Sequence, residues 1–239
     1  MTIGFRQKMS DGRRAMAHLV HIWHERNGWS HKVLPALAEC LDLGSVHSSQ
    51  LSNLRNGKLA SPRPEVFLAL AQANKVLFSG TYLIKDTLAE IHPELLKVLS
   101  ESSLPLVGDD GNPLSAGVFL EIFLGLAPLP KGFDWFIEDQ EASILSAALA
   151  DYLCNKRPWR YCRDELMHAY VINKPERRER FAEVMAGLRD YTAVELDGEL
   201  LDLYATYVAL GREKCDGVVG FLDILRKRSL NSSNNEISS

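Results

Sequence analysis

The chain of 239 residues lacks the features that mark several large classes of protein. Its longest apolar run, from Ala116 to Ala127, includes Glu121 and is too short to span a bilayer, so we expect no membrane association. No apolar segment follows the charged Arg6 and Lys8, so we expect no secretory signal peptide. The cysteines are few and widely spaced, without a Cys-x-x-Cys pair: Cys40, Cys154, Cys162 and Cys215. These absences indicate a cytoplasmic protein with ordinary buried thiols.

Motifs for catalysis and for nucleotide binding are also missing. The chain has neither a Gly-x-x-x-x-Gly-Lys phosphate loop nor a Gly-x-Ser-x-Gly nucleophile motif. The histidines at 18, 21 and 24 have a spacing that a metal ion can use, but no cysteine or carboxylate accompanies them at ligand spacing. We therefore expect no enzyme activity, no cofactor and no metal site. We interpret the three histidines as a solvated row on the first helix, available to phosphate.

Apolar residues recur at the helical period along most of the chain. Within residues 11–27, for example, Met16, Leu19, Val20 and Trp23 form one apolar face. Strong period-two alternation, the mark of a strand, is absent, so we expect an all-α protein. Further helices are expected at residues 30–41, 47–56, 65–73, 86–99 with a break at His92-Pro93, 115–126, 138–155, 161–172, 175–191, 197–210 and 213–228.

Loop-forming residues and composition divide the chain into four parts. The segment 104–113 is rich in Pro and Gly and is the expected domain boundary. We expect an N-terminal domain over residues 10–78, a helical linker and loop over 79–111, and an all-helical domain for dimerisation or sensing over 112–228. The Ser- and Asn-rich residues 229–239 are expected to form a disordered tail.

The segment from Ser48 to Lys58 carries the most informative pattern. On a helix over residues 48–56, Leu51 and Leu54 form an inward edge, and the side chains that point most nearly away are polar and uncharged: Ser49, Ser52, Asn53 and Asn56. A solvated helix face usually carries Lys and Glu. Ser and Asn are suited to hydrogen bonds with the edges of DNA bases.

This stretch resembles the second half of the Cro/repressor-type (XRE-like) helix-turn-helix family, whose recognition helix has the form Ser-x-Ile/Leu-Ser-x-Leu-x-Asn-Gly-Lys. Residues 49–58 match that form in order and spacing, and Phe67 to Ala73 resembles the Leu-x-x-Leu-Ala-x-Ala-like run that follows in the family. The preceding helix differs from the family, because it contains Pro35 and is separated from Leu51 by about three more residues than a tight turn allows. We therefore expect a longer turn around residues 42–47.

The resemblance implies a fold class and a function. The fold is an N-terminal helix-turn-helix domain of four to five helices, followed by a larger helical domain. The function is that of a sequence-specific DNA-binding transcription regulator, with duplex DNA as its partner. By this resemblance, the residues that approach base edges are Ser48, Ser49 and Asn53, and those that approach phosphates are Lys32, Asn56, Lys58 and Arg63.

A homodimer is expected through the C-terminal domain, because one helix-turn-helix reads few base pairs and such proteins usually bind paired half-sites. The segment 197–228 contains more apolar side chains than one helix face can bury, which supplies a candidate pairing surface. These side chains are Leu200, Leu201, Leu203, Tyr204, Tyr207, Val208 and Leu210.

The charges are distributed unevenly between the two ends of the chain. Residues 1–75 carry ten Lys and Arg against five Asp and Glu, whereas the remainder carries 17 against 26. A basic N-terminal part favours association with nucleic acid. The cluster Glu176–Arg180 is interpreted as a solvated helix face whose three arginines are further candidates for phosphate contact.

A second function remains open beside DNA binding. The chain is also consistent with a protein-interaction module, in which a degenerate helix-turn-helix accompanies an acidic helical domain that binds a partner protein. Pro35 and the lengthened turn favour this alternative. Salt-dependent binding to random duplex DNA would distinguish the two functions.

Overall fold

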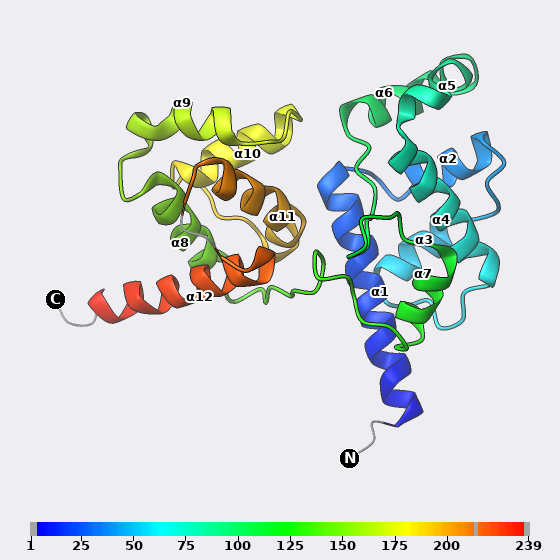
Figure 1. The fold of residues 1–239 in the computed structure, drawn as a ribbon, viewed down its shortest axis with the longest axis horizontal. Coiled ribbons are helices and arrows are strands. Elements are labelled where there is room, and N and C mark those ends of the chain that lie inside the picture. The colour runs from blue at the N-terminus through cyan, green and yellow to red at the C-terminus, as the bar shows by residue number, and fades with distance from the viewer. Residues whose placement is uncertain (1–3, 213–214, 237–239) are drawn as a thin grey trace. The chain divides into compact units, whose positions relative to one another are not determined.

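The computed structural model of the protein describes residues 4–212 and 215–236, with the backbone alone for residues 230–236. In this part of the chain every regular element is a helix, and extended pairing is limited to one bridge between Val107 and Pro113. The all-α fold class is therefore confirmed. Figure 1 shows the helices α1 (Phe5–Asn27), α2 (Val33–Cys40), α3 (Ser48–Arg55), α4 (Pro64–Ser79), the 3-10 helix η1 (Thr81–Ile84), α5 (Lys85–Ile91), α6 (Pro93–Glu101), α7 (Ala116–Phe123), α8 (Ala142–Cys154), α9 (Trp159–Ala169), α10 (Pro175–Met185), α11 (Ala193–Ala209) and α12 (Gly217–Glu236).

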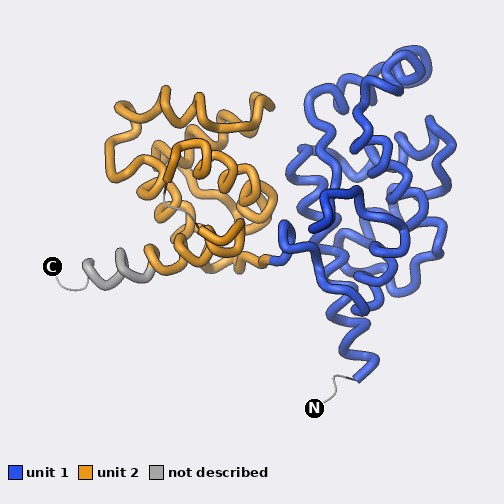
Figure 2. The backbone as a smooth tube through the Cα atoms, viewed as in Figure 1, with its two compact units in different colours: residues 1–134 blue, residues 135–239 orange. Residues whose placement is uncertain are grey.

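The helices form two compact units, residues 1–134 and residues 135–239 (Figure 2). The first unit contains α1 to α7, and the second contains α8 to α12. The domain boundary expected at residues 104–113 therefore lies inside the first unit. Helix α7, which the sequence assigned to the second domain, packs instead on α1 and α4.

Two buried asparagines explain why the loop 104–113 belongs to the first unit. Asn27, at the end of α1, donates through Nδ2 to the carbonyl of Leu104 (3.0 Å) and accepts from its N–H through Oδ1 (2.7 Å). Asn74, in α4, forms the same pair of bonds with Leu106, at 2.8 and 2.7 Å. Both asparagines are fully buried, and the bonds of Asn74 satisfy backbone groups of the fully buried Leu106, whereas Leu104 is half-buried. The loop is thereby fixed to α1 and α4.

A close approach between α1 and the end of α7 completes this unit. A Cβ at Gly12 would lie 2.3 Å from the backbone nitrogen of Gly125, and a Cβ at Gly125 would lie 2.1 Å from the carbonyl oxygen of Lys8. Any larger residue at either position would force the two segments apart. The contact lets Phe119 of α7 stack on Trp23 of α1, with ring centroids 6.5 Å apart.

The second unit is built around α8, which packs on α9, α10, α11 and α12. Its core includes a contact between Tyr152 of α8 and Tyr207 of α11, whose hydroxyl oxygens are 2.8 Å apart. The connection into this unit is fixed by Arg226 of α12, which donates to the carbonyl of Phe136 (2.8 Å) and to both carboxylate oxygens of Glu141 (2.6 and 3.0 Å).

The bounds of several helices differ from those expected. The expected break at His92-Pro93 is present between α5 and α6. Helix α4 continues to Ser79, because Asn74 bonds to the loop 104–113 and does not end the helix. Helix α12 reaches Glu236, so residues 229–236 of the expected disordered tail are helical. Residues 237–239, and the start of this helix expected at Glu213, lie outside the described residues.

None of the helices in the described residues combines the length and the apolar composition that crossing a bilayer requires.

Candidate DNA-binding surface on helix α3

Local hydrogen bonds define both ends of α3. At its start, the side-chain Oε1 of Gln50 accepts a bond from the backbone N–H of His47 (3.0 Å). At its end, Gly57 adopts the left-handed conformation with φ of 65°, and the N–H of Lys58 bonds to the carbonyl of Asn53 (2.8 Å). This is the Schellman arrangement, in which glycine avoids the strain that a Cβ would cause. The backbone of Lys58 is therefore held in a fixed position beside the last turn of α3.

Helix α3 packs on α1 and leaves its opposite face exposed. Leu51 and Leu54 are buried, as the inward edge of this helix requires. On the opposite side Ser49, Asn53 and Asn56 are exposed and Ser52 is half-buried. The row of uncharged polar side chains expected to point outward is therefore accessible to a partner along most of its length.

The residues expected to contact DNA are not equally free to do so. Ser49 and Asn53 are exposed, while Ser48, at the first helical position, is half-buried. Asn56 donates through Nδ2 to the carbonyl of Ser52 (2.7 Å), so its amide group is already used at the end of the helix. Among the three cations expected at phosphates, Lys58 follows α3 directly, Arg63 precedes α4, and Lys32 precedes α2; all three are exposed.

Helix α2 is positioned differently from what a tight helix-turn-helix requires. Residues 41–47 connect it to α3, which confirms that this turn is longer than the short connection typical of the motif. Gly44, with φ of 110°, lies against Ala69 of α4. Helix α2 packs on α4 and α6, whereas α3 packs on α1. Lys32, which precedes α2, is therefore not brought to α3 by packing between these two helices. Pro35 occupies the first turn of α2, where a missing N–H costs no helical bond.

Arg55 fixes α3 to α1. Its Nε donates to Nδ1 of His21 (3.2 Å), and its Nη2 lies 3.4 Å from the carboxylate of Glu25. Both ion-pair partners are about one quarter exposed, at 25% and 24% of their side-chain surface. Arg55 is therefore engaged with α1, on the side of α3 away from the polar row.

The histidine row of α1 is partly covered, with His24 buried and His18 and His21 half-buried, which corrects the expectation of a solvated face. His24 is fully buried, and its Nδ1 donates to the carbonyl of Val20 (2.7 Å). Burial, reinforced by the nearby guanidinium of Arg55, lowers the pKa of His21 to about 4. Burial also lowers the pKa of His24 to about 4. These side chains are therefore neutral at pH 7 and do not serve as cations for phosphate.

Arg14 is a basic residue of this surface that the sequence analysis did not single out. A Cβ at Gly57 would lie 3.9 Å from the side chain of Ala17, so the end of α3 passes over Ala17. Arg14 precedes Ala17 by one turn of α1, close to the same face of the helix, and is exposed. The spacing of Arg14 and Ala17 can be read from the sequence. That Arg14 lies near the end of α3 follows only once the structure shows which face of α1 contacts α3.

The arginines at the start of α10 do not form the solvated face expected for them. Arg177 is buried, with Nη2 2.6 Å from a carboxylate oxygen of Glu199 and 2.9 Å from one of Asp202. Arg180 is paired with Glu195 and Glu199, each at 3.0 Å. These ion pairs bind α10 to α11, so neither arginine is available to phosphate.

Within the described residues, no three His, Cys, Asp or Glu side chains are grouped closely enough to hold a metal ion.

Comparison with known proteins follows the division into two units. Residues 142–236 match a family described as "Domain of unknown function (DUF8645)". Residues 6–125 match a family described as "Domain of unknown function (DUF8644)". No curated protein and no solved structure matched the chain. The interval between the two matches contains the junction of the units, so each family corresponds to one unit. Because the first match covers half of the sequence, the chain belongs to the DUF8644 family.

Proposed function

We propose that the protein is a sequence-specific DNA-binding transcription regulator that reads duplex DNA with α3. The observation that supports this most is the exposed, uncharged polar face of α3. That face has the composition expected for contact with base edges, because Ser and Asn can both donate and accept hydrogen bonds there. Ser49 and Asn53 are the base-reading residues in this proposal, with Ser48 at the margin.

Exposed cations at the end of α3 supply the phosphate contacts of the proposal. Lys58 is held next to the last turn by the Schellman bonds, and Arg14 extends the face of α1 that this turn crosses. Arg63 directly precedes α4. Contacts of this kind fix the position of a protein on the duplex, while side chains that reach the bases determine the sequence.

Fluorescence anisotropy of the full-length chain with labelled random duplex DNA tests the proposal. We expect binding at low salt that weakens about a hundredfold between about 50 and about 200 mM salt, if about four phosphates are contacted. Selection from a random duplex library would then give the preferred site. A folded protein that fails to bind at low salt, or that selects no sequence, would contradict the proposed function.

The homodimer stays part of this proposal, but its expected surface changes. Leu200, Leu203 and Tyr207 of α11 are buried in the core of the second unit, so the expected pairing face is reduced to the exposed Val208 and three half-buried side chains, Leu201, Tyr204 and Leu210. The first unit instead exposes Tyr82 and Leu83, at 74% and 62%. We expect sedimentation equilibrium to find a dimer for the full chain and a weaker one for Leu83→Glu. A monomer in both cases would remove the dimer from the proposal.

One observation favours the alternative, a protein-interaction module. Helix α2 contacts α4 and α6, and seven residues separate it from α3, so the two helices do not share the compact packing of a helix-turn-helix. If the first unit is such a module, the anisotropy experiment will find no salt-dependent binding to DNA. Dimerisation would not distinguish the alternatives, because either kind of protein can pair.

A further inference from the structure

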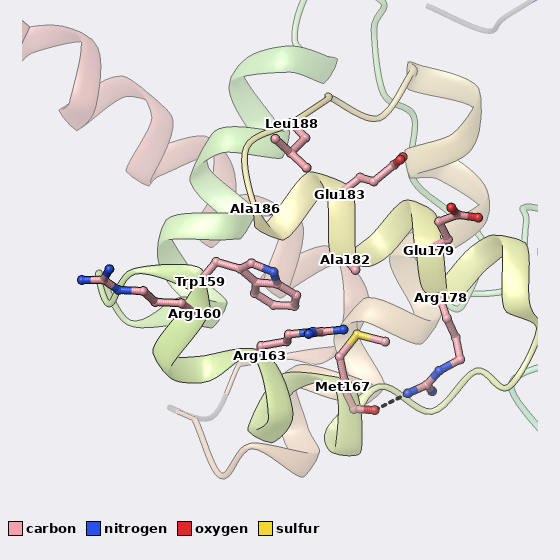
Figure 3. A pocket seen from close by; sticks show the side chains of 10 residues that line it. All are labelled: Trp159, Arg160, Arg163, Met167, Arg178, Glu179, Ala182, Glu183, Ala186 and Leu188. Carbon is pink, nitrogen blue, oxygen red and sulfur yellow. Dashed lines mark hydrogen bonds between the residues drawn. The ribbon is translucent and has the colours of Figure 1, made fainter.

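The second unit carries a groove between α9 and α10 that the DNA-binding proposal does not use. Its volume is about 570 Å³, and Figure 3 shows it between the two helices. The lining consists of Trp159, Arg160, Arg163, Met167, Arg178, Glu179, Ala182, Glu183, Ala186 and Leu188. The residues come from both helices and from the turn after α10, so the groove has two different walls.

The two walls carry opposite charges. Arg160 and Arg163 are exposed on α9, while Glu179 and Glu183 line the groove from α10. In the described part of the chain, none of the ion pairs joins these arginines to these glutamates. The charges therefore remain available to a bound partner, and a partner that satisfies both walls must itself carry charges of both signs.

Apolar side chains lie between the charged walls. Figure 3 shows Trp159 and Met167 of α9 facing the small Ala182 of α10. Leu188, in the turn after α10, is 79% exposed and borders the same groove. The exposed leucine, the indole and the thioether form an apolar surface, and a partner that covers it would gain binding free energy from its burial.

Contacts at one end of the groove hold its helices together. Arg178, the third arginine of the cluster at the start of α10, donates to the carbonyls of Met167 (2.5 Å) and Ile172 (2.8 Å) at and beyond the last turn of α9, as Figure 3 marks for Met167. Beside it, Tyr170 stacks on Phe181 with centroids 4.2 Å apart. Because Arg178 is committed to these carbonyls, it shapes the groove, and the other cations of its wall are Arg163 and Arg160, whose guanidinium lies 4.6 Å from the ring centroid of Tyr161.

We propose that this groove binds a helical segment of a partner protein, with acidic side chains facing α9, an apolar stripe over Trp159 and Met167, and basic side chains facing α10. Arg163 extends toward α10, whereas Arg160 extends away from it (Figure 3), and the two glutamates are four residues apart on α10, so the acidic wall presents charges about one helical turn apart. Residues four apart on a partner helix repeat at the same interval. A third helix lying between two others is a common mode of peptide recognition.

Peptide selection on the full-length chain tests this proposal. A phage-displayed library of random peptides of about 16 residues, long enough for about four helical turns, would be selected on the protein. Synthetic copies of the selected peptides would then be titrated by calorimetry. We expect an acidic edge, an apolar stripe and a basic edge in the selected sequences, and binding about tenfold weaker to Arg160→Glu/Arg163→Glu.

Two controls make the result specific. Lys227→Glu replaces an exposed cation on α12 that does not line the groove. This variant should bind the peptides with the same affinity as the unaltered chain. Peptides with their acidic and basic edges exchanged should prefer a variant with all four wall charges reversed.

The proposal would be overturned if no peptide is selected. It would also be overturned if the affinity of the selected peptides changes neither with Arg160→Glu/Arg163→Glu nor with reversal of all four wall charges. Loss of affinity for random duplex DNA in Arg160→Glu/Arg163→Glu, without loss of peptide binding, would assign this wall to nucleic acid and also overturn it.

Discussion

Asn53 and Lys58 stand at adjacent points of one surface, yet the proposed function gives them different effects. We expect Asn53→Ala to lose about 1–3 kcal/mol on the selected site and little on random DNA, because its amide faces outward where a base edge would lie. Lys58→Ala should weaken binding to both DNAs by similar amounts, since phosphates are present in every sequence. Anisotropy on the two DNAs measures the difference, with the exposed Lys97→Ala on α6 as the control. Equal losses on both DNAs for Asn53→Ala would remove it from the base-reading residues.

The buried His24 should make the stability of the protein depend on pH. Its folded-state pKa of about 4 lies below the ordinary value of 6.5, so the unfolded chain binds more protons between these values. The stability is therefore fully present above about pH 6.5 and is lost as the pH falls toward 4, by about 3 kcal/mol at most for this group. His21 changes stability in the same direction, and it faces Arg55 of α3 and the neighbouring His18.

Thermal unfolding of the full-length protein between about pH 7 and about pH 5 measures this effect. In the unaltered chain the melting temperature of the first unit should fall across that interval. In His24→Gln the fall should be smaller, because the group that takes up the proton is gone. An unchanged pH dependence in His24→Gln would show that other groups control the acid sensitivity.

At the scale of elements, Asp197 links α11 to the segment that enters the second unit. Its side chain is 6% exposed and accepts a bond from the backbone of Ile137. Burial, with Glu141 nearby, raises the pKa of Asp197 to about 8. The folded protein thus binds more protons than the unfolded chain between about pH 4 and about pH 8, and this carboxyl makes folding less favourable as the pH rises through that range.

Asp197→Asn removes this dependence. We expect the melting temperature of the variant to exceed that of the unaltered chain at about pH 9, because the amide carries no charge to bury. At about pH 5 the difference in melting temperature should be smaller. Differential scanning calorimetry at the two pH values gives the comparison. A difference between the chains that is the same at both values would mean that Asp197 does not titrate in this interval.

The elements show why sequence reasoning succeeded for α3 and failed for the loop 104–113. Helical periodicity and a glycine stop are local signals, so Leu51, Leu54 and Gly57 were sufficient to place α3 and its outward face. The loop has the composition of a linker, and what holds it is a pair of asparagines about 30 and 80 residues away along the chain. Such long-range hydrogen bonds leave no periodic pattern in the sequence.

The same limit applies to the candidate sites. The sequence identified the uncharged row of α3, but assigned the histidines of α1 and the arginines of α10 to solvent. Both assignments failed because a charged or polar side chain looks the same in sequence whether a neighbouring helix covers it or not. Only the placement of α3 over His21, and of Glu199 beside Arg177, reveals that these side chains are engaged.

At the scale of the whole molecule, the first unit should fold as residues 1–134 and not as a shorter fragment. A fragment ending at residue 78 retains the helices that resemble the Cro/repressor-type family but loses α7 and the loop 104–113. It would leave Asn27 and Asn74 without their backbone partners and would expose Trp23, which stacks on Phe119. Circular dichroism with thermal unfolding should show a cooperative transition for residues 1–134 and none for residues 1–78. Cooperative unfolding of the shorter fragment would mean that α7 is not needed for the fold.

The connection between the units is anchored at both ends. On one side the backbone N–H of Lys131 donates to Asp109 (2.8 Å), and on the other the carbonyl of Phe136 accepts from Arg226. The chain between these anchors spans at most about 18 Å, at about 3.5 Å per residue. A partner held by the groove of the second unit would thus be presented to a duplex held by the first at an effective concentration on the order of millimolar. A partner that also contacts the duplex would therefore occupy the groove and the DNA together at concentrations below the dissociation constant of either contact alone.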